Sequence, residues 1–214
     1  MAVRAVVMDL GDVLERVGDA SWPTVWAERW AGEAGLDEAG LEAALARHEP
    51  VGDLLTGEAT EADFRSAYSA ALGLSEEQAD RMMAEMWDGY CGELDVALHG
   101  YWLSLRDHGV RLGILSNSMD GARREEGRRY GFPDQADVIV YSHEVGLAKP
   151  DPAIYALTVE RLGVQPGEVA FLDNSVENVE AARACGWQAL VHEDTERSIA
   201  WLRGLLDGSA VGGV

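Results

Sequence analysis

The stretch from Val3 to Leu14 constrains the fold of this chain more than any other part of the sequence. A short apolar run from Ala5 to Met8 ends at Asp9, and Gly11 follows two residues later. An apolar run of this length, bounded by glycine, is typical of a buried strand in a parallel sheet. Open α/β sheets place their active sites at the carboxyl ends of strands, but Asp is also a common turn residue. Asp9 is therefore either a turn residue or a candidate active-site carboxylate.

The second half of the chain predicts the rest of a parallel sheet. Strand-like runs alternate there with single helical segments, which is the pattern of βαβ units. The predicted strands are 111–116, 138–141, 169–172 and 188–191, and the predicted helices are 96–108, 119–130, 152–162, 176–185 and 195–206. The strand that ends at Asp9 belongs with them. We therefore expect an α/β core with a Rossmann-like parallel sheet.

Residues from about 21 to 88 show helical periodicity and no convincing strand. Trp22, Trp26 and Trp30 recur every four residues, so they share one face of a helix. We interpret this stripe as packing inside the helical region, with the opening of a site or a dimer partner as alternatives. Further helices are expected after the capping residues Asp37, Thr60 and Ser75.

These patterns divide the chain into a core and an insert. We expect residues 1–15 and 96–207 to form the α/β core, and residues 16–95 to form an α-helical cap inserted after the first strand. Residues 208–214 are small, and we expect them to form a flexible tail.

The charge balance limits the possible partners. The chain has 17 Lys and Arg against 38 Asp and Glu, a net charge of −21, which disfavours nucleic acid and anionic membranes as partners.

Cys91 and Cys185 lie in no metal-binding pattern, and we expect two free thiols in a reducing cytosol. The run that stops at Asp9 is too short for a signal peptide, and no segment approaches the ~20 apolar residues of a membrane span. We therefore expect a cytoplasmic protein, as a monomer or a homodimer, in which a small anionic substrate would need local positive groups or a metal.

Polar residues follow several of the predicted strands. Because the carboxyl ends of parallel strands lie along one edge of the sheet, these side chains can converge. Together they supply a carboxylate nucleophile, an anion-binding hydroxyl, a fixed positive charge and a second carboxylate that could bind a metal. The residues are Asp9, Ser116 with Asn117, Lys149, and Asp173 with Asn174.

This ordered set resembles the four motifs of the haloacid dehalogenase superfamily, in the phosphatase-like branch whose first motif is Asp-x-Gly. The matching stretches are Asp9-Leu10-Gly11, Ser116-Asn117, Lys149-Pro150 and Asp173-Asn174. Each motif alone is weak, but the four occur in the family's order and span nearly the whole chain. The resemblance implies a hydrolase with an α/β core and a helical cap.

The resemblance also implies a role for each matching residue. Asp9 would attack the substrate and form an aspartyl intermediate, and Lys149 would neutralise charge on the nucleophile and the transferred group. Ser116 would donate a hydrogen bond to the substrate, although it could equally cap the following helix. Gly11 and Asn117 would complete the substrate site, with a purely structural Asn117 as the alternative.

The family resemblance further implies Mg²⁺, held by Asp9, the carbonyl of Gly11, Asp173 and Asn174. Two departures from the family pattern affect this expectation. Gly11 stands where the family usually has an Asp that acts as general acid, a contribution of ~10²–10⁴ in rate. Asn174 stands where a second acid is usual, which should weaken Mg²⁺ binding.

Three functions therefore remain open. The favoured one is a Mg²⁺-dependent phosphatase of a small phosphorylated metabolite, with an aspartyl-phosphate intermediate on Asp9. The second is a metal-independent 2-haloacid dehalogenase, which would usually have a small neutral residue at Asp173 and an arginine from the cap for the substrate carboxylate. The third is a catalytically impaired binding or regulatory protein, which Gly11 and Asn174 support.

Overall fold

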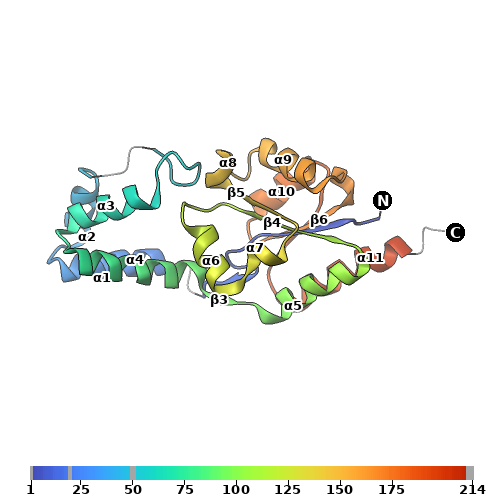
Figure 1. The fold of residues 1–214 in the computed structure, drawn as a ribbon, viewed down its shortest axis with the longest axis horizontal. Coiled ribbons are helices and arrows are strands. Elements are labelled where there is room, and N and C mark those ends of the chain that lie inside the picture. Colours follow the sequence, from blue (N-terminus) through green and yellow to red (C-terminus); the bar gives the residue numbers. More distant parts are fainter. Residues whose placement is uncertain (1, 19–20, 49–51, 211–214) are drawn as a thin grey trace.

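The computed structural model describes residues 2–18, 21–48 and 52–210. Their centre is a parallel sheet of five strands in the order β5-β4-β1-β6-β7 (Figure 1). The strands are β1 (Ala5–Met8), β4 (Arg111–Ser116), β5 (Val138–Tyr141), β6 (Val169–Asp173) and β7 (Gln188–Val191). The predicted fold class, a Rossmann-like α/β core with an inserted helical region, is confirmed.

Helices cover both faces of the sheet, so β1 is buried on both sides (Figure 1). Alternate residues of β1 enter two different apolar clusters: Val6 and Met8 pack with Trp102, whereas Ala5 and Val7 pack with Tyr155. This explains why β1 is a continuous apolar run rather than an alternating one. The covering helices are α5 (Val96–Ser104) and α11 (Thr195–Ala210) on one face, and α9 (Pro152–Leu162) and α10 (Val176–Ala184) on the other.

The inserted region lies at one end of the core and is helical (Figure 1). Its helices are α1 (Trp22–Glu33), α2 (Glu38–Leu45), α3 (Glu61–Leu72) and α4 (Glu76–Cys91). The expected caps are present: Asp37 accepts from the backbone of α2, and Thr60 and Ser75 each form a capping box.

A short antiparallel pair, β2 (Glu15–Arg16) and β3 (Glu93–Leu94), was not predicted. This pair connects the segment in which the chain leaves the sheet with the segment in which it returns. We propose these two strands as the hinge between core and cap, close to the boundaries expected from the sequence.

The tryptophan stripe of α1 is divided between several environments. Trp30 is fully buried, and its Nε1 donates to Glu85 at 3.0 Å. Trp26 stacks on Phe64 of α3 with ring centroids 6.1 Å apart. Trp22 lies on the wall of a cavity beside Asp9. The stripe therefore contributes both to packing inside the helical region and to the surroundings of the candidate site.

Several expected boundaries differ in the structure. The helix expected over 119–130 begins only at Ala122, because the chain turns at Gly121 with φ 96°. The last helix runs to Ala210, so Gly208 belongs to it, and the rest of the expected tail, 211–214, lies outside the described residues. The remaining short elements are η1 (Leu105–His108), α6 (Ala122–Tyr130), α7 (Phe132–Gln135), α8 (Ser142–Val145) and η2 (Pro166–Glu168).

Cys91 and Cys185 are both free thiols, as expected. Within the described part of the chain, none of the helices has the length and apolar character that crossing a membrane requires.

Candidate active site

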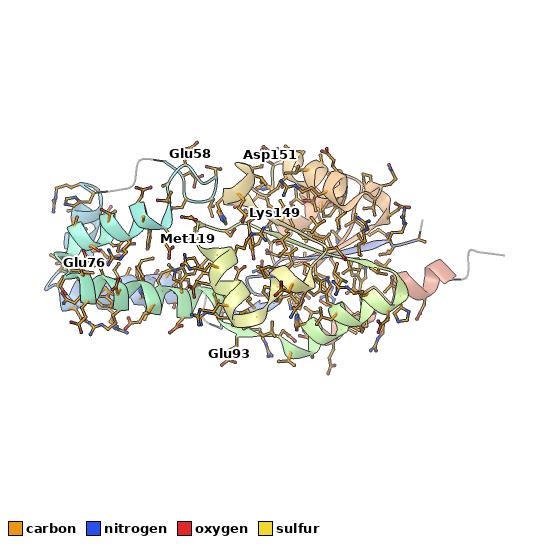
Figure 2. The ribbon with its side chains drawn as sticks, viewed as in Figure 1. Glu58, Glu76, Glu93, Met119, Lys149 and Asp151 are labelled. Carbon is orange, nitrogen blue, oxygen red and sulfur yellow. The ribbon has the colours of Figure 1, made fainter. Side chains whose placement is uncertain are left out.

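Asp9 follows directly after the central strand, at the carboxyl edge of the sheet. Its backbone N–H donates to the carbonyl of Leu172 at 2.9 Å, which ties it to β6. The neighbours of β1 are β4 and β6, so the strand order changes direction at this position. Ligands of open α/β sheets bind at such switch points. Lys149 lies at the same edge, near the side that faces the helical region (Figure 2).

The ammonium group of Lys149 connects the two carboxylates of the site. Its Nζ lies 2.8 Å from Asp9 Oδ1 and 2.6 Å from Asp173 Oδ2, and it donates to the carbonyl of Leu115 at 3.0 Å. All its donors are therefore engaged, and the side chain is 1% exposed. Although burial alone would lower it, the pKa of Lys149 is held above its ordinary value by Asp9 and Asp173.

Asp173 is fully buried, and both of its oxygens are occupied. Oδ1 accepts from the backbone of Ser175 at 2.8 Å and from Asn178 Nδ2 at 3.1 Å. Oδ2 accepts from Lys149 and also from Asn178 at 3.2 Å. Four hydrogen bonds therefore occupy the carboxylate in this arrangement, and one of them holds Lys149.

Asn117 fixes the backbone on which Lys149 is mounted. Its Nδ2 donates to the carbonyl of Lys149 at 2.8 Å, and its Oδ1 accepts from the backbone N–H of Lys149, also at 2.8 Å. The sequence left open whether Asn117 is structural or binds substrate; both of its amide atoms are engaged with the Lys149 backbone, and the residue also lines the cavity in front of Asp9. Ser116 does not cap the next helix, because α6 begins after Gly121.

A cavity of about 230 Å³ opens in front of Asp9. Five of the predicted site residues lie on its wall: Asp9, Gly11, Ser116, Asn117 and Lys149. The other two do not, since Asp173 lies behind Lys149 and Asn174 is exposed to solvent.

Asp9 is almost completely buried, with 10% of its side chain exposed. Burial raises its pKa to about 6, while Lys149 opposes this rise and Asp173 adds to it. At neutral pH most of the Asp9 population is therefore ionised, which a carboxylate nucleophile requires.

Gly11 leaves open space where the family usually has an acid. A Cβ atom built on it would meet no other atom within 4 Å, and its φ is not in the left-handed region. The next residue, Asp12, does not replace that acid, because it is exposed and its Oδ1 accepts from the backbone of Val17 at 3.1 Å.

Glu15 was missed by the sequence reasoning and lies on the same cavity wall as Asp9. Its side chain is 1% exposed, and its Oε1 is buried without a hydrogen-bond partner among the described residues. Burial raises the pKa of Glu15 well above its ordinary value, and the charges of Glu126 and Asp9 raise it further. No periodic pattern in the sequence could have revealed this residue, because β2 is only two residues long.

Glu126 of α6 lies near Glu15 and is fully buried. Its Oε2 accepts from the hydroxyl of Tyr141, and its Oε1 has no partner within the described ranges. Burial raises the pKa of Glu126 to about 8. Burial therefore favours the neutral, proton-carrying form of both carboxyl groups, Glu15 and Glu126.

The family resemblance implies Mg²⁺ at Asp9, Gly11, Asp173 and Asn174. The described residues contain no group of three His, Cys, Asp or Glu side chains that could hold a metal. Asp173 is saturated and Asn174 is neutral, which leaves the single charge of Asp9 and the carbonyl of Gly11. Mg²⁺ takes six oxygen ligands, but proteins usually bind it through one or two carboxylates, with water and substrate phosphate at the other positions. In this arrangement Asp9 and the carbonyl of Gly11 supply only part of such a site, and water and substrate phosphate would have to supply the rest.

The family model for haloacid dehalogenase-like hydrolases matches residues 3–186, most of the chain. The chain belongs to this family of hydrolases. The resemblance inferred from the ordered motifs is thereby confirmed.

Individual relatives are more distant. Phosphoserine phosphatase of Thermus thermophilus is 28% identical over 170 residues, covering 77% of this chain and 66% of that protein. Phosphorylated carbohydrates phosphatase of Thermotoga maritima is 32% identical over 102 residues, covering 48% of this chain and 44% of that protein. The chain thus aligns with less than two thirds of the length of either relative.

The fold also matches solved structures of the family. A family enzyme of Bacteroides thetaiotaomicron, crystallised with magnesium and inorganic phosphate, superposes with a TM-score of 0.68. The two chains are 22% identical, and the match covers 90% of this chain and 95% of the other. At this identity the likeness establishes the shared fold.

Proposed function

We propose that this protein is a phosphatase that hydrolyses a small phosphate monoester through Asp9. One observation carries this proposal: Asp9, Ser116 and Lys149 line a single cavity, with Lys149 Nζ 2.8 Å from Asp9 Oδ1. The phosphatase names of the two relatives and the phosphate bound by the Bacteroides enzyme support it.

In the first step an Asp9 oxygen attacks phosphorus, and the bond between phosphorus and the leaving oxygen breaks. The products are an aspartyl phosphate and an alkoxide, which takes up a proton to become the alcohol. In the second step water attacks the phosphorus, and inorganic phosphate leaves with the Asp9 carboxylate restored. Lys149 balances negative charge on Asp9, and the Ser116 hydroxyl donates a hydrogen bond to a phosphate oxygen.

The leaving oxygen needs a proton that Gly11 cannot supply. We assign this proton to Glu15, because its carboxyl group lies on the same cavity wall and its buried Oε1 makes no hydrogen bond to another described residue. A group held neutral by burial can donate a proton to the alkoxide and later accept one from the attacking water. Glu15 would thereby perform the task of the acid that the family usually places at position 11.

The dehalogenase alternative has weaker support. It requires a cation for the substrate carboxylate, and no arginine lies on the described wall of the Asp9 cavity. Arg29 is paired with Glu85, and Arg65 is paired with Glu76 and Asp80. The non-catalytic alternative leaves unexplained why Asp9 and Lys149 are buried together at a cavity.

The test is phosphate release from a panel of phosphate monoesters by the wild type and by Asp9→Asn. We expect the substitution to lower kcat/KM by at least ~10³-fold, because it removes the nucleophile. Asp12→Asn is the matched control, since Asp12 is exposed and absent from the cavity wall, and it should retain activity.

Other outcomes would overturn the proposal. Halide release from 2-haloacids, with no phosphate release from any ester, would establish the dehalogenase alternative. A folded wild type that hydrolyses nothing would favour the non-catalytic one.

A further inference from the structure

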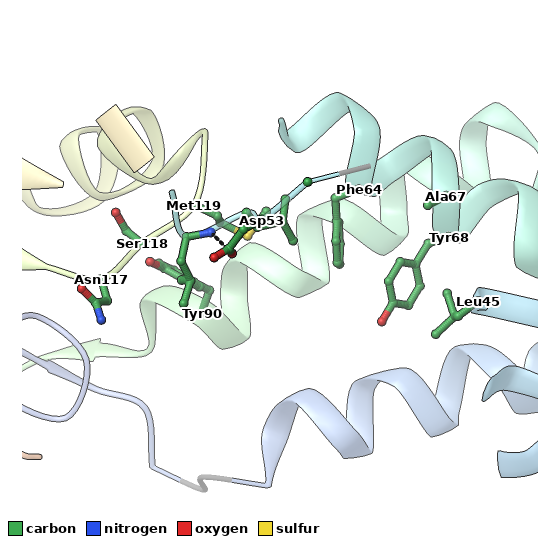
Figure 3. A pocket seen from close by; sticks show the side chains of 12 residues that line it. Leu45, Asp53, Phe64, Ala67, Tyr68, Tyr90, Asn117, Ser118 and Met119 are labelled. Atoms are coloured by element: carbon green, nitrogen blue, oxygen red, sulfur yellow. Dashed lines mark hydrogen bonds between the residues drawn. The ribbon is translucent and has the colours of Figure 1, made fainter. Parts of the chain in front are cut away.

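A second, larger cavity lies between the helical region and the core. Its volume is about 550 Å³, within the range of pockets that hold small organic molecules. Figure 3 shows Asn117, Ser118 and Met119 of the core on one side, and Phe64, Tyr68 and Leu45 of the helical region on the other. The remaining lining residues are Gly52, Asp53, Leu54, Leu55, Ala67 and Tyr90.

The wall of this cavity is mainly apolar and aromatic. Phe64 and Tyr68 form one continuous surface, with ring centroids 4.6 Å apart. No lysine, arginine or histidine belongs to the described wall, and its charged member is Asp53. The Oδ1 atom of Asp53 already accepts from the backbone of Leu55 at 2.8 Å (Figure 3). This surface therefore favours an apolar ligand and opposes an anionic one.

The large cavity adjoins the candidate active site. Asn117 and Tyr90 belong to the walls of both cavities. Ser118, on the wall of the large cavity, follows Ser116, on the wall of the small one, by two residues. A substrate with its phosphate in front of Asp9 can therefore extend past Tyr90 into the apolar space.

We propose that the large cavity receives the leaving group, and that the substrate is the phosphate monoester of an uncharged alcohol with an apolar, aromatic-sized body. This inference rests on the proposed phosphatase function. A sugar or polyol would lose water from its hydroxyl groups against a wall that offers few partners. A carboxylate or second phosphate on the leaving group would lie near Asp53 without a cation to pair with. The inferred class therefore differs from phosphoserine and from phosphorylated carbohydrates.

The first experiment compares alkyl phosphates that differ in the body of the alcohol. We expect kcat/KM for 2-phenylethyl phosphate to exceed that for ethyl phosphate by at least ~10-fold, because burial of the phenyl group stabilises the complex. Glycerol 3-phosphate and phosphoserine should do no better than ethyl phosphate. Aryl esters are avoided, because phenols are better leaving groups and would raise the rate without any contact to the cavity.

The second experiment changes the cavity wall. Leu55 is 43% exposed, so Leu55→Asp should leave the fold intact while adding a second carboxylate to the wall. We expect the preference for 2-phenylethyl over ethyl phosphate to fall at least ~5-fold, since one apolar contact is worth about that much or more. Val25→Asp is the matched control: Val25 is 55% exposed on α1 and does not line this cavity, so the preference should persist.

The outcomes separate this inference from the proposed function. If the protein hydrolyses ethyl and phenylethyl phosphate equally well, or prefers glycerol 3-phosphate or phosphoserine, the leaving-group inference is wrong and the phosphatase function stands. If it hydrolyses no phosphate ester at all, the function fails and the inference fails with it. An equal loss of preference in Leu55→Asp and Val25→Asp would also contradict the proposed location.

Discussion

Two groups of buried ionisable residues meet beside Asp9, and they are built in opposite ways. In the first, Lys149 lies between Asp9 and Asp173, and all the donors of its ammonium group are engaged. In the second, Glu15 and Glu126 each have a buried oxygen without a partner among the described residues. The residues of both groups are buried, so burial alone does not distinguish the groups.

The difference shows how one edge of a sheet can hold both a base and an acid. Where an ammonium group faces two carboxylates, charge pairing offsets the cost of burial and the groups remain ionised. Where carboxyl groups are buried close to one another, the same cost favours the protonated form. The first group thus suits a nucleophile, and the second suits proton donation.

The largest effect should come from breaking the first group. Lys149→Met leaves the carboxylates of Asp9 and Asp173 buried without their counter-charge, and removal of one partner of a buried pair costs ~3–5 kcal/mol. We expect a loss of that size in the free energy of unfolding by denaturant, together with loss of phosphatase activity.

Arg4→Met is the control for Lys149→Met. Arg4 pairs with Glu168 at the surface, with its side chain 61% exposed, and exposed pairs contribute at most ~1 kcal/mol. Equal losses in the free energy of unfolding of the two variants would mean that the buried contacts of Lys149 stabilise the protein no more than an exposed ion pair does.

The next effect concerns Glu15 as proton donor. Glu15→Gln should lower kcat by ~10²–10⁴ for alkyl phosphates, the usual contribution of general acid catalysis. The loss should be much smaller for 4-nitrophenyl phosphate, because nitrophenolate leaves readily without a proton. A purely structural role would lower both rates by the same factor.

The open space at Gly11 allows a rescue of this variant. A side chain at this position meets no atom within 4 Å of its Cβ, so Gly11→Asp can place a carboxyl group in the cavity. In the Glu15→Gln background, Gly11→Asp should restore part of the rate for alkyl phosphates. Gly11→Asn is the control of the same size, which cannot donate the required proton and should restore nothing.

A smaller effect, on the free energy of unfolding, is expected from substitution of Glu126. Its pKa is about 8 in the folded protein and near 4.5 when it is unfolded. Between these values the folded state holds a proton that the unfolded state has lost, so the free energy of unfolding falls as pH rises. Glu126→Gln removes this dependence, and the variant should gain at least ~1 kcal/mol relative to the wild type between pH 5 and pH 9.

Denaturant titrations across this pH range measure the effect, with Glu125→Gln as the neighbouring control. Although burial opposes it, Arg128 and Arg124 hold the pKa of Glu125 below its ordinary value. Its contribution to stability is therefore present above that ordinary value and is lost as pH falls through the lowered pKa. Its substitution should not improve stability at high pH. The charges of Asp9, Arg123 and Glu144 also act on Glu126. If the difference in the free energy of unfolding between Glu126→Gln and the wild type stays constant across this pH range, these charges already offset the effect of the Glu126 titration.

Sequence reasoning reached the first group and missed the second for a physical reason. Asp9 and Ser116 stand at the ends of apolar runs, and parallel pairing brings such ends together, so their convergence could be predicted. Lys149 lies beyond the short helix α8 and does not end an apolar run, so its place in the motif order identified it. The Rossmann-like sheet and the helical insert follow from the same periodicities.

Glu15 depends on information that no local pattern holds. It is buried because β2 pairs with β3, where it faces Leu94, far along the chain. The saturation of Asp173 was equally hidden, since it depends on the side chain of Asn178 turning back toward the strand end. The apolar cavity joins residues of α2, α3, α4 and the strand ends, so it exists only in the folded arrangement.

The last and smallest effect concerns the binding of Mg²⁺, which tests whether the contacts between Lys149, Asp9 and Asp173 persist when a cation is offered. Because Asp173 is saturated, only the charge of Asp9 remains available to a cation, and we expect calorimetry to detect little binding of Mg²⁺ alone. Inorganic phosphate should increase this binding, since it supplies oxygen ligands and negative charge. Asn174→Asp should also increase it, because a second carboxylate would then stand at an exposed position beside Asp173. Tight binding of Mg²⁺ alone by the wild type would mean that Asp173 leaves Lys149 to bind the metal. The contacts of Lys149 with Asp9 and Asp173 would then not be fixed, and the contrast with Glu15 and Glu126 would fail.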